Sequence, residues 1–321
     1  MTSILITGAA GFVGQELAAG FAAFSNITIT LTDIVEPPVP PTVQKGENVK
    51  FNCLASDLTS ASAVASLLAN RFDAVYTLHG IMSGGAEANL ELGLKVNLDS
   101  QRLFLDYLRN NHPGTVVVFA SSCAVYGPTE PGEIVTEKTL PLPQSSYGTQ
   151  KYMVEALVND YSRRGLLDGR IVRLPTVTVR AGAPTAATSS FASGIIREPL
   201  RGQESILPVN RDLEVWISSP ATVVKNLIAI KDVPKEKFGL FRVVNLPGIL
   251  VTVNEMLDAL EQVGGKEKRA LVKEERDPAT EKVVYSWPTK FNTQRATDLG
   301  LSADVPFLET VRVFAQREGL L

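Results

Sequence analysis

A strand that runs directly into a glycine-rich turn and then into a helix restricts the fold of this chain more than any other feature. Residues 3–7 are apolar and predict a short strand, and residues 15–23 have the composition of a helix. The residues between them read Gly-Ala-Ala-Gly-Phe-Val-Gly, with glycines at Gly8, Gly11 and Gly14. Such a turn lets the backbone approach a pyrophosphate, whose charge then lies at the helix N-terminus. Tight turns need glycine in any case, so this reading requires support from the rest of the chain.

Segments of strand and helix composition alternate through the first half of the chain. After residues 3–7, further short apolar strands are expected at 27–32, 49–53, 74–78, 116–120 and 171–174. Helices are expected from near residue 60, at 90–111 and at 147–164. This alternation predicts an α/β fold with a doubly wound parallel sheet of the Rossmann type.

The alternation ends at Pro175. Helices are then expected at 189–200, 220–230, 255–263 and 307–318, with strands at 214–218 and 242–246. We expect residues 1–175 to form a dinucleotide-binding Rossmann domain that is completed by about 214–246. Residues 176–213 and 247–321 are expected to form a smaller α/β C-terminal substrate lobe. The cleft between the two is the default substrate site.

Two acidic residues follow the second and third expected strands. Asp33 stands at the end of the second, where a carboxylate accepts hydrogen bonds from a ribose diol and repels a 2′-phosphate. It therefore indicates NAD rather than NADP, with a plain turn residue as the alternative. Asp57 and Leu58 follow the third strand, where Asp57 either meets an adenine edge or caps the helix that begins near Ser60. Both alternatives stay open at this point.

A tyrosine and a lysine four residues apart, Tyr147 and Lys151, share one face of an expected helix. If this face borders a pocket, the ammonium lowers the pKa of the phenol and lets it exchange a proton near neutral pH. Two surface side chains often have this spacing, so the pair indicates catalysis only together with other motifs of the chain. Ser121 and Ser122 end the expected strand at 116–120 and supply a hydroxyl. Together with a dinucleotide site, these groups indicate redox chemistry.

Composition excludes several classes of function. A hydrophobic content of 45% with 20% charged residues indicates a buried core, and the net charge of −3 gives no reason to expect nucleic acid or an anionic membrane as partner. Cys53 and Cys123 are too few for a disulfide scaffold, so a reducing, cytoplasmic location is expected. With His79 and His112 they make no zinc-type cluster, so no metal is expected. No apolar run approaches the ~20 residues of a membrane span.

In this order, the motifs resemble the extended short-chain dehydrogenase/reductase family, in its epimerase/dehydratase-like branch. The resemblance covers nearly the whole chain. It implies that Tyr147 is the acid/base, that Lys151 binds the nicotinamide ribose and lowers the tyrosine pKa, and that a serine holds the reacting oxygen. Ser122 lies 25 residues before Tyr147, which is the family's spacing, and is therefore preferred to Ser121.

The same resemblance implies an NAD site and a homodimer built on the helices at 90–111 and 147–164. His79 and Gly80 stand where many members have two alanines, which is expected to change only packing, so His79 is interpreted as a packed or backbone-contact residue. The cofactor-binding residues implied by the resemblance are Gly8, Gly11, Phe12, Val13, Gly14, Asp33, Asp57, Leu58, Leu78, His79, Asn97, Tyr147, Lys151 and Pro175.

A closer resemblance connects the chain to a subgroup of sugar-acid dehydrogenases, the D-erythronate dehydrogenase-like proteins. It rests on residues 81–87, 174–177, 179–182 and 189–200. It implies a small sugar-acid substrate, D-erythronate or a related aldonate. Arg180 is the first choice for the carboxylate, because guanidinium binds carboxylate bidentately, with a surface salt bridge as the alternative. Arg197 is a weaker candidate, and Ser83, Ser122 and Thr176 are expected to hydrogen-bond the substrate.

Two rival functions remain. A nucleotide-sugar epimerase or dehydratase would use the same scaffold with retained NAD, and Arg180, Arg197 and Arg201 could serve a diphosphate. A non-catalytic dinucleotide sensor is the second rival. The set of Ser122, Tyr147 and Lys151 argues against a sensor, which needs no activated phenol.

Overall fold

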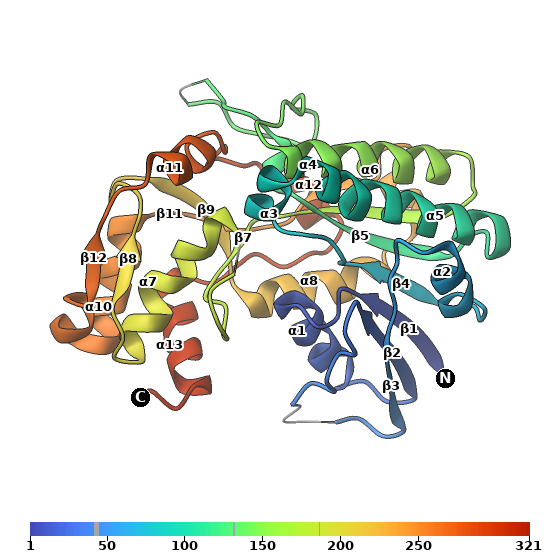
Figure 1. Ribbon diagram of the computed structural model, residues 1–321, viewed down its shortest axis with the longest axis horizontal. Helices are drawn as coiled ribbons and strands as arrows, with labels where there is room; N and C mark the ends of the chain where they lie inside the picture. The colour runs from blue at the N-terminus through green and yellow to red at the C-terminus, as the bar shows by residue number, and fades with distance from the viewer. Residues whose placement is uncertain (42–44, 131, 186) are drawn as a thin grey trace.

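The computed structural model describes residues 1–41, 45–130, 132–185 and 187–321. A seven-stranded parallel sheet dominates the described chain and lies on the right of Figure 1. Its strands occur in the order β10-β6-β5-β4-β1-β2-β3. They span β1 Thr2–Thr7, β2 Ile27–Asp33, β3 Val49–Ala55, β4 Ala74–Thr77, β5 Val116–Ser122, β6 Asp168–Leu174 and β10 Val243–Asn245.

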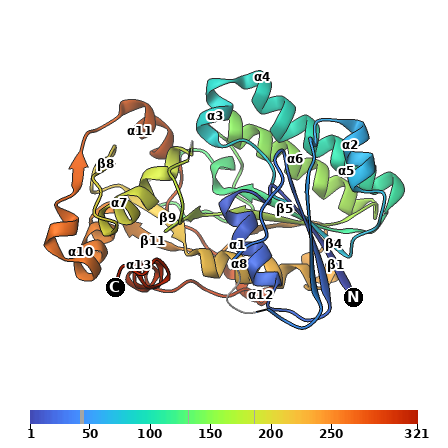
Figure 2. The same cartoon turned by 60° about the horizontal axis from the view of Figure 1, so that its bottom comes forward.

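Helices cover both faces of this sheet (Figures 1 and 2). One face packs against α1 (Phe12–Phe21) and α8 (Pro220–Lys231), which share an apolar core with β1 and β2. The other face packs against α2 (Ala61–Leu67), α5 (Ser100–Asn111) and α6 (Ser146–Arg163). Because both faces are covered, the central strands β1 and β4 are buried along most of their length, as in other doubly wound sheets, whereas the edge strand β3 is partly exposed. The predicted α/β fold class is confirmed.

The strand order reverses at β1, which lies between β4 and β2. Connections on the two sides of this point leave toward opposite faces of the sheet, so a crevice opens at the carboxyl ends of the strands. The glycine turn after β1, the loop after β4 and the serine pair that ends β5 all lie at this edge. The topology thus gathers the sequence motifs at one place.

The segment expected as one helix at 90–111 is divided. It begins as α4 (Leu90–Gly93), continues as a π-helix, η1 (Leu94–Asp99), and ends as α5. The wider π turn contains Asn97, and π segments occur frequently at functional sites. The helical stretch expected at 90–111 is confirmed, and the π turn within it was not expected.

A short helix, α3 (Ser83–Ala88), lies after β4, where no helix is expected from the sequence. Its composition, with two glycines, gives no helical signal. The carboxylate of Glu87 accepts a 2.8 Å hydrogen bond from Ser146 N at the start of α6. Tertiary contact with α6 therefore overrides local propensity here.

The remaining elements form a smaller lobe, on the left of Figure 1, with its own apolar core. It contains a three-stranded sheet in the order β11-β9-β7 and a two-stranded sheet of β12 and β8. Its strands are β7 Thr176–Val177, β8 Ser205–Leu207, β9 Glu214–Ser218, β11 Ile249–Thr252 and β12 Val272–Glu274. Its helices are α7 Phe191–Leu200, α10 Val253–Arg269, α11 Pro278–Val284 and α13 Phe307–Arg317.

The segment 214–246 contributes to both parts of the molecule. Its β9 strand belongs to the three-stranded sheet, whereas β10 is an edge strand of the seven-stranded sheet and α8 packs against that sheet. Near the C-terminus, α12 (Gln294–Asp298) also returns to the large sheet, where Ala296 is buried in the same core as β1. The domain boundaries given above stay a prediction. No helix in the described part of the chain is long and apolar enough to cross a membrane.

Candidate active site

A cavity of about 410 Å³ lies at the carboxyl ends of the large sheet's strands, between this sheet and the lobe. The glycine turn, the ends of β4, β5 and β6 and the start of α6 form one side. Residues of β7 and β9 and the segment 284–289 form the other. Of the expected cofactor residues, Gly8, Gly11, Phe12, Val13, Gly14, Leu78, Tyr147, Lys151 and Pro175 line it, as do all four expected substrate residues.

Two glycines of the turn, Gly8 and Gly14, have no room for a side chain. Gly8 has φ of 66°, and a Cβ there would lie 2.6 Å from the backbone nitrogen of His79. A Cβ on Gly14 would lie 2.6 Å from the carbonyl oxygen of Gly8. Gly11 is the N-cap of α1 and places no side chain over the first amides of the helix. The end of α1 thus fits an anionic pyrophosphate.

Asp33 lies against this turn. Its Oδ2 accepts a 3.0 Å hydrogen bond from Ala10 N, and its Oδ1 accepts one of 2.7 Å from Ile34 N. The carboxylate is half-buried at the end of β2. It stabilises the turn, which is the alternative considered for Asp33, and lies outside the cavity wall; its role toward a ribose diol stays a prediction.

Asp57 does not cap a helix. Its Oδ1 accepts hydrogen bonds from Thr59 N at 2.9 Å and Thr59 Oγ1 at 2.8 Å, which lower the pKa of the carboxyl. The N-cap of α2 is Ser60, whose hydroxyl accepts from Ala63 N. The capping alternative is therefore wrong. Asp57 and the buried Leu58 both lie outside the cavity wall.

His79 packs inside the fold. Its Nδ1 lies 2.6 Å from Thr7 Oγ1, and its Nε2 lies 3.2 Å from Ser100 Oγ. Burial, and then the positive charge of Lys151, lower the pKa of the imidazole to about 3. A neutral, fully engaged ring suits the packing role expected for this residue and leaves no group for catalysis.

Asn97 is fully buried and joins three segments around the cavity. Its Oδ1 accepts from Ile81 N at 2.8 Å, and its Nδ2 donates to Ile81 O and to Gln150 Oε1. It holds the loop after β4 against α6. Asn97 itself is not part of the cavity wall, so any effect on a cofactor passes through that loop.

The three expected catalytic side chains meet at one end of the cavity. Ser122, which ends β5, lies near enough to the phenol of Tyr147, on the first turn of α6, for its hydroxyl to lower the pKa of that phenol. The ammonium of Lys151 lies 5.6 Å from the centre of the Tyr147 ring and donates a 2.8 Å hydrogen bond to Ala120 O. Tyr147 and Lys151 share the helix face that borders the cavity, as their spacing predicts.

Burial has the largest effect on the pKa values of Tyr147 and Lys151. It raises the pKa of Tyr147 to about 12, against a smaller lowering by the hydrogen bond from Ser122. It also lowers the pKa of Lys151 to about 8, against a raising effect of Glu155. The expected phenol that exchanges its proton near neutral pH is therefore wrong for the protein without its cofactor. Loss of solvation around the phenolate is the physical reason.

The structure distinguishes the two adjacent serines. The hydroxyl of Ser121 is buried and donates a 2.5 Å hydrogen bond to Glu155 Oε1, away from Tyr147. The hydroxyl of Ser122 accepts from Ala124 N at 3.1 Å and faces Tyr147. This arrangement supports the preference for Ser122.

The expected substrate residues line the cavity from several directions. Ser83, at the start of α3, hydrogen-bonds the hydroxyl of Thr188 at 3.1 Å. Thr176 lies in β7, directly after Pro175. The Nε and Nη2 atoms of Arg180 are buried and have no hydrogen-bond partner among the described residues. Arg197 is instead engaged by Glu198 and by the carbonyl oxygen of Arg180.

Both tryptophans of the chain line the same cavity, and sequence reasoning missed them. Trp216 on β9 stacks on Phe291 with ring centres 5.1 Å apart, and its buried Nε1 has no partner among the described residues. Trp287 follows α11. The one sequence signal that could have identified them is their residue type, because tryptophan is rare and large aromatic side chains favour pocket walls. In the described chain, no group of three or more His, Cys, Asp or Glu could hold a metal ion.

Residues 4–233 match the NAD dependent epimerase/dehydratase family. The chain belongs to this family. Its cofactor is NAD, and the resemblance inferred from the motifs is confirmed. The open turn at Gly8, the free end of α1 and the carboxylate of Asp33 fit this dinucleotide.

Two relatives match over nearly their full length. The chain is 38% identical to D-erythronate dehydrogenase of Haemophilus influenzae, over 98% of each chain. It is 39% identical to D-erythronate dehydrogenase of Cupriavidus necator, over 99% of each. The crystal structure of a nucleoside-diphosphate-sugar epimerase from Agrobacterium tumefaciens superposes with a TM-score of 0.89 at 35% identity, over 99% of this chain and 94% of that one.

Proposed function

We propose that this protein oxidises a hydroxyl group of a small sugar acid with NAD, most specifically D-erythronate or a closely related aldonate. The observation that carries the proposal is the guanidinium of Arg180, which lines the cavity with two buried nitrogens that have no partner among the described residues. The names of the two D-erythronate dehydrogenases, together with identities of 38% and 39%, support the same substrate class.

The buried guanidinium of Arg180 would be stabilised by an anionic ligand. Burial, and then the nearby charge of Arg197, lower the pKa of this guanidinium. Leaving charged donors buried and unpaired costs about 1–3 kcal/mol or more. A carboxylate at Arg180 would satisfy both nitrogens at once, because its two oxygens match the guanidinium fork. Such a site favours an acid over a neutral sugar.

The chain's own residues then perform the remaining steps. Bound NAD supplies the acceptor for the hydride. Without the cofactor, burial raises the pKa of the Tyr147 phenol to about 12, so the base form requires the positive charges of bound NAD+ and Lys151 to lower it. Tyr147 in that form takes the proton of the substrate hydroxyl, and Ser122 holds that oxygen by a hydrogen bond. Lys151 supplies the positive charge that stabilises the phenolate. Arg180 fixes the carboxylate, so that one carbinol carbon is presented to the cofactor.

The rival function is epimerisation or dehydration of a nucleotide sugar, which the name of the Agrobacterium tumefaciens protein raises. A diphosphate needs more than one free cation. Arg197 pairs with Glu198, however, and Arg201 pairs with Glu318. Of the three arginines, Arg180 is thus the one without an acidic partner among the described residues. A single available arginine suits one carboxylate better than a diphosphate.

The deciding measurement is NADH formation from NAD+ across four- to six-carbon aldonic and uronic acids, beside UDP-sugars. Turnover of D-erythronate or a close aldonate is the expected result. A changed UDP-sugar without net NADH would move the protein to the epimerase class.

Arg180→Met should lower kcat/KM for the acid about 10- to 100-fold, as for a lost hydrogen bond to a charged group, with NADH affinity unchanged. Arg201→Met, at an ion pair outside the cavity wall, is the matched control.

We further propose a homodimer that uses α5 and α6, and a cytoplasmic location in which the free thiols of Cys53 and Cys123 stay reduced. Tyr152 and Met153 leave apolar surface exposed on α6, which supports the interface. Sedimentation at working concentration should give twice the monomer mass. A single species at the monomer mass would contradict the dimer.

A further inference from the structure

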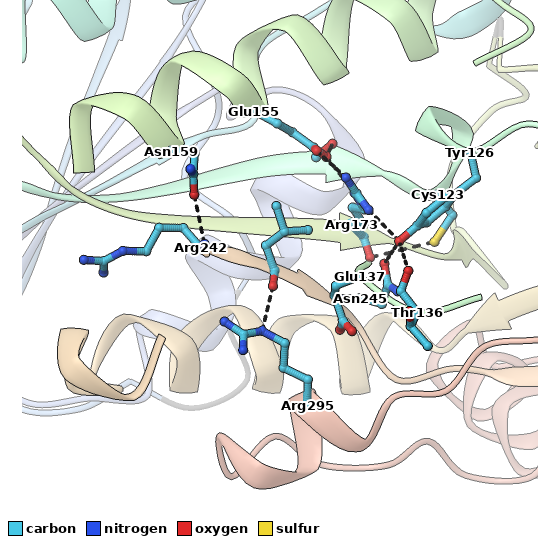
Figure 3. Close-up of polar contacts among 12 residues, drawn as sticks. Cys123, Tyr126, Thr136, Glu137, Glu155, Asn159, Arg173, Arg242, Asn245 and Arg295 are labelled. Carbon is cyan, nitrogen blue, oxygen red and sulfur yellow. Dashed lines mark hydrogen bonds and ion pairs between the residues drawn. The ribbon is translucent and has the colours of Figure 1, made fainter. Parts of the chain in front are cut away.

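A buried ion pair joins the catalytic helix to the neighbouring strand. Arg173 on β6 donates two parallel hydrogen bonds to Glu155 on α6, from Nε at 2.9 Å and from Nη2 at 2.6 Å. Each side chain is 2% exposed. Figure 3 shows Arg173 between Glu155 on one side and Tyr126 on the other. A bidentate pair of this kind keeps both charges satisfied in a dry interior.

The guanidinium is fixed from its other side as well. Arg173 Nη1 donates to the hydroxyl oxygen of Tyr126 at 2.5 Å, and this hydroxyl lies 2.9 Å from Asn245 Oδ1 on β10. The backbone nitrogen of Asn245 in turn donates to Glu137 Oε1 (Figure 3). The position of Glu155 is thus set by contacts to β6 and, through Arg173, to β10.

Two side chains of α6 hold two consecutive residues of β5. Lys151 donates to Ala120 O at 2.8 Å, and Glu155 accepts from Ser121 Oγ at 2.5 Å. Ser122 is the next residue along the strand. Because Lys151 and Glu155 are one helical turn apart, they lie on the same face of α6. The carboxylate of Glu155 is thus bonded to the residue before Ser122 and lies one helical turn from Lys151.

We propose that Glu155, held in place by Arg173, is a positioning residue that keeps the buried ammonium of Lys151 charged and the end of β5 in register with the catalytic helix. This inference rests on the role proposed above for Lys151. It assigns no contact with substrate or cofactor to Glu155, which lies outside the cavity wall.

The charges around Lys151 support this role. From its own helix it faces Tyr147, which is neutral because burial raises its pKa to about 12, and Glu155. His79, after β4, is neutral because burial lowers its pKa to about 3. Cys123, beside Arg173, is neutral because burial raises its pKa to about 12. Glu155 raises the pKa of Lys151 against the larger lowering by burial.

The test is a pH titration of lysine ε-13C signals by NMR, with Lys151 assigned through Lys151→Arg. In E155Q, which keeps the shape of the side chain, the pKa of Lys151 should fall by about 1 unit or more, because a nearby opposite charge shifts a pKa by ~1–3 units. An unchanged pKa would overturn the proposal. The measurement needs no sugar acid, so its failure and a wrong substrate assignment are distinguishable.

A matched control comes from the same strand. Asp168 begins β6 and pairs with the buried Arg170 at 2.7 Å, in contact with α8 rather than α6. D168N should lower stability and leave the pKa of Lys151 unchanged; an equal shift in D168N would overturn the assignment to Glu155. If E155Q does not fold, the double variant E155Q/R173M removes both charges of the buried pair, so that neither is left without its partner, and it should also lower the pKa of Lys151.

Discussion

The ammonium of Lys151 donates a 2.8 Å hydrogen bond to the carbonyl oxygen of Ala120 and so fixes the catalytic helix to the strand that carries Ser122. A lysine has three donor hydrogens. Among the described residues, Ala120 is its one hydrogen-bond acceptor, so further donors stay available at the cavity. One side chain can therefore hold the architecture and also bind a ligand.

Tyr147→Phe should lower turnover by about 10²- to 10⁴-fold, because general acid–base catalysis contributes this much. NADH affinity should stay near that of the wild type, since the ring remains in place. Turnover is measured by NADH absorbance and binding by NADH fluorescence. The control is Tyr152→Phe, an exposed tyrosine on the same helix. Retained turnover in Tyr147→Phe would contradict the mechanism.

The two serines at the end of β5 should behave differently. Ser122→Ala should lower kcat by about 10- to 100-fold, because the reacting oxygen loses a hydrogen bond to a group that becomes charged. Ser121→Ala removes a buried donor to Glu155 and should mainly lower the free energy of unfolding, by about 1–3 kcal/mol. Steady-state kinetics and urea unfolding of both variants test this. The reverse pattern would assign the catalytic hydroxyl to Ser121.

The stability of the protein should depend on pH through Lys151. Its pKa falls from 10.5 to about 8 on folding, because burial penalises the ammonium. Between these values the unfolded chain binds more protons, so this residue's contribution to stability rises with pH. Lys151→Met should therefore gain up to about 3 kcal/mol over the wild type at pH 7, a gain that disappears by pH 10.5. Urea unfolding at several pH values measures it, and a difference that does not change with pH would contradict the buried charge.

Asp33 should decide the choice of cofactor. Asp33→Ser removes the charge that would repel a 2′-phosphate, so the ratio of kcat/KM for NAD+ over NADP+ should fall about 10- to 100-fold. Kinetics with both cofactors give the ratio. The serine hydroxyl is able to accept the hydrogen bond from Ala10 N, and thermal unfolding checks that the turn is intact. A wild-type protein that prefers NADP+ would contradict the role of Asp33.

Local patterns were sufficient for much of the large sheet. Short apolar strands and amphipathic helices are encoded by neighbouring residues, so all seven of its strands and the helix that carries Tyr147 were predicted. The strands of the smaller lobe were harder to predict from the sequence. Strands such as β8 and β12 have three residues each and exist because they pair with each other, which no local pattern records. The π-helix around Asn97 likewise depends on contacts to Ile81 and Gln150.

The sequence by itself determined the parts of the site that depend on short spacing. The glycine turn at Gly8 and the helical pair of Tyr147 and Lys151 are fixed by a few neighbouring residues. Tertiary structure gave the physical reason for the preference for Ser122, because Glu155 from another element engages Ser121. It also decided that Arg180 has buried nitrogens without a partner while Arg197 is paired. Burial and pairing depend on residues far apart in the chain, and they set the charges on which the chemistry relies.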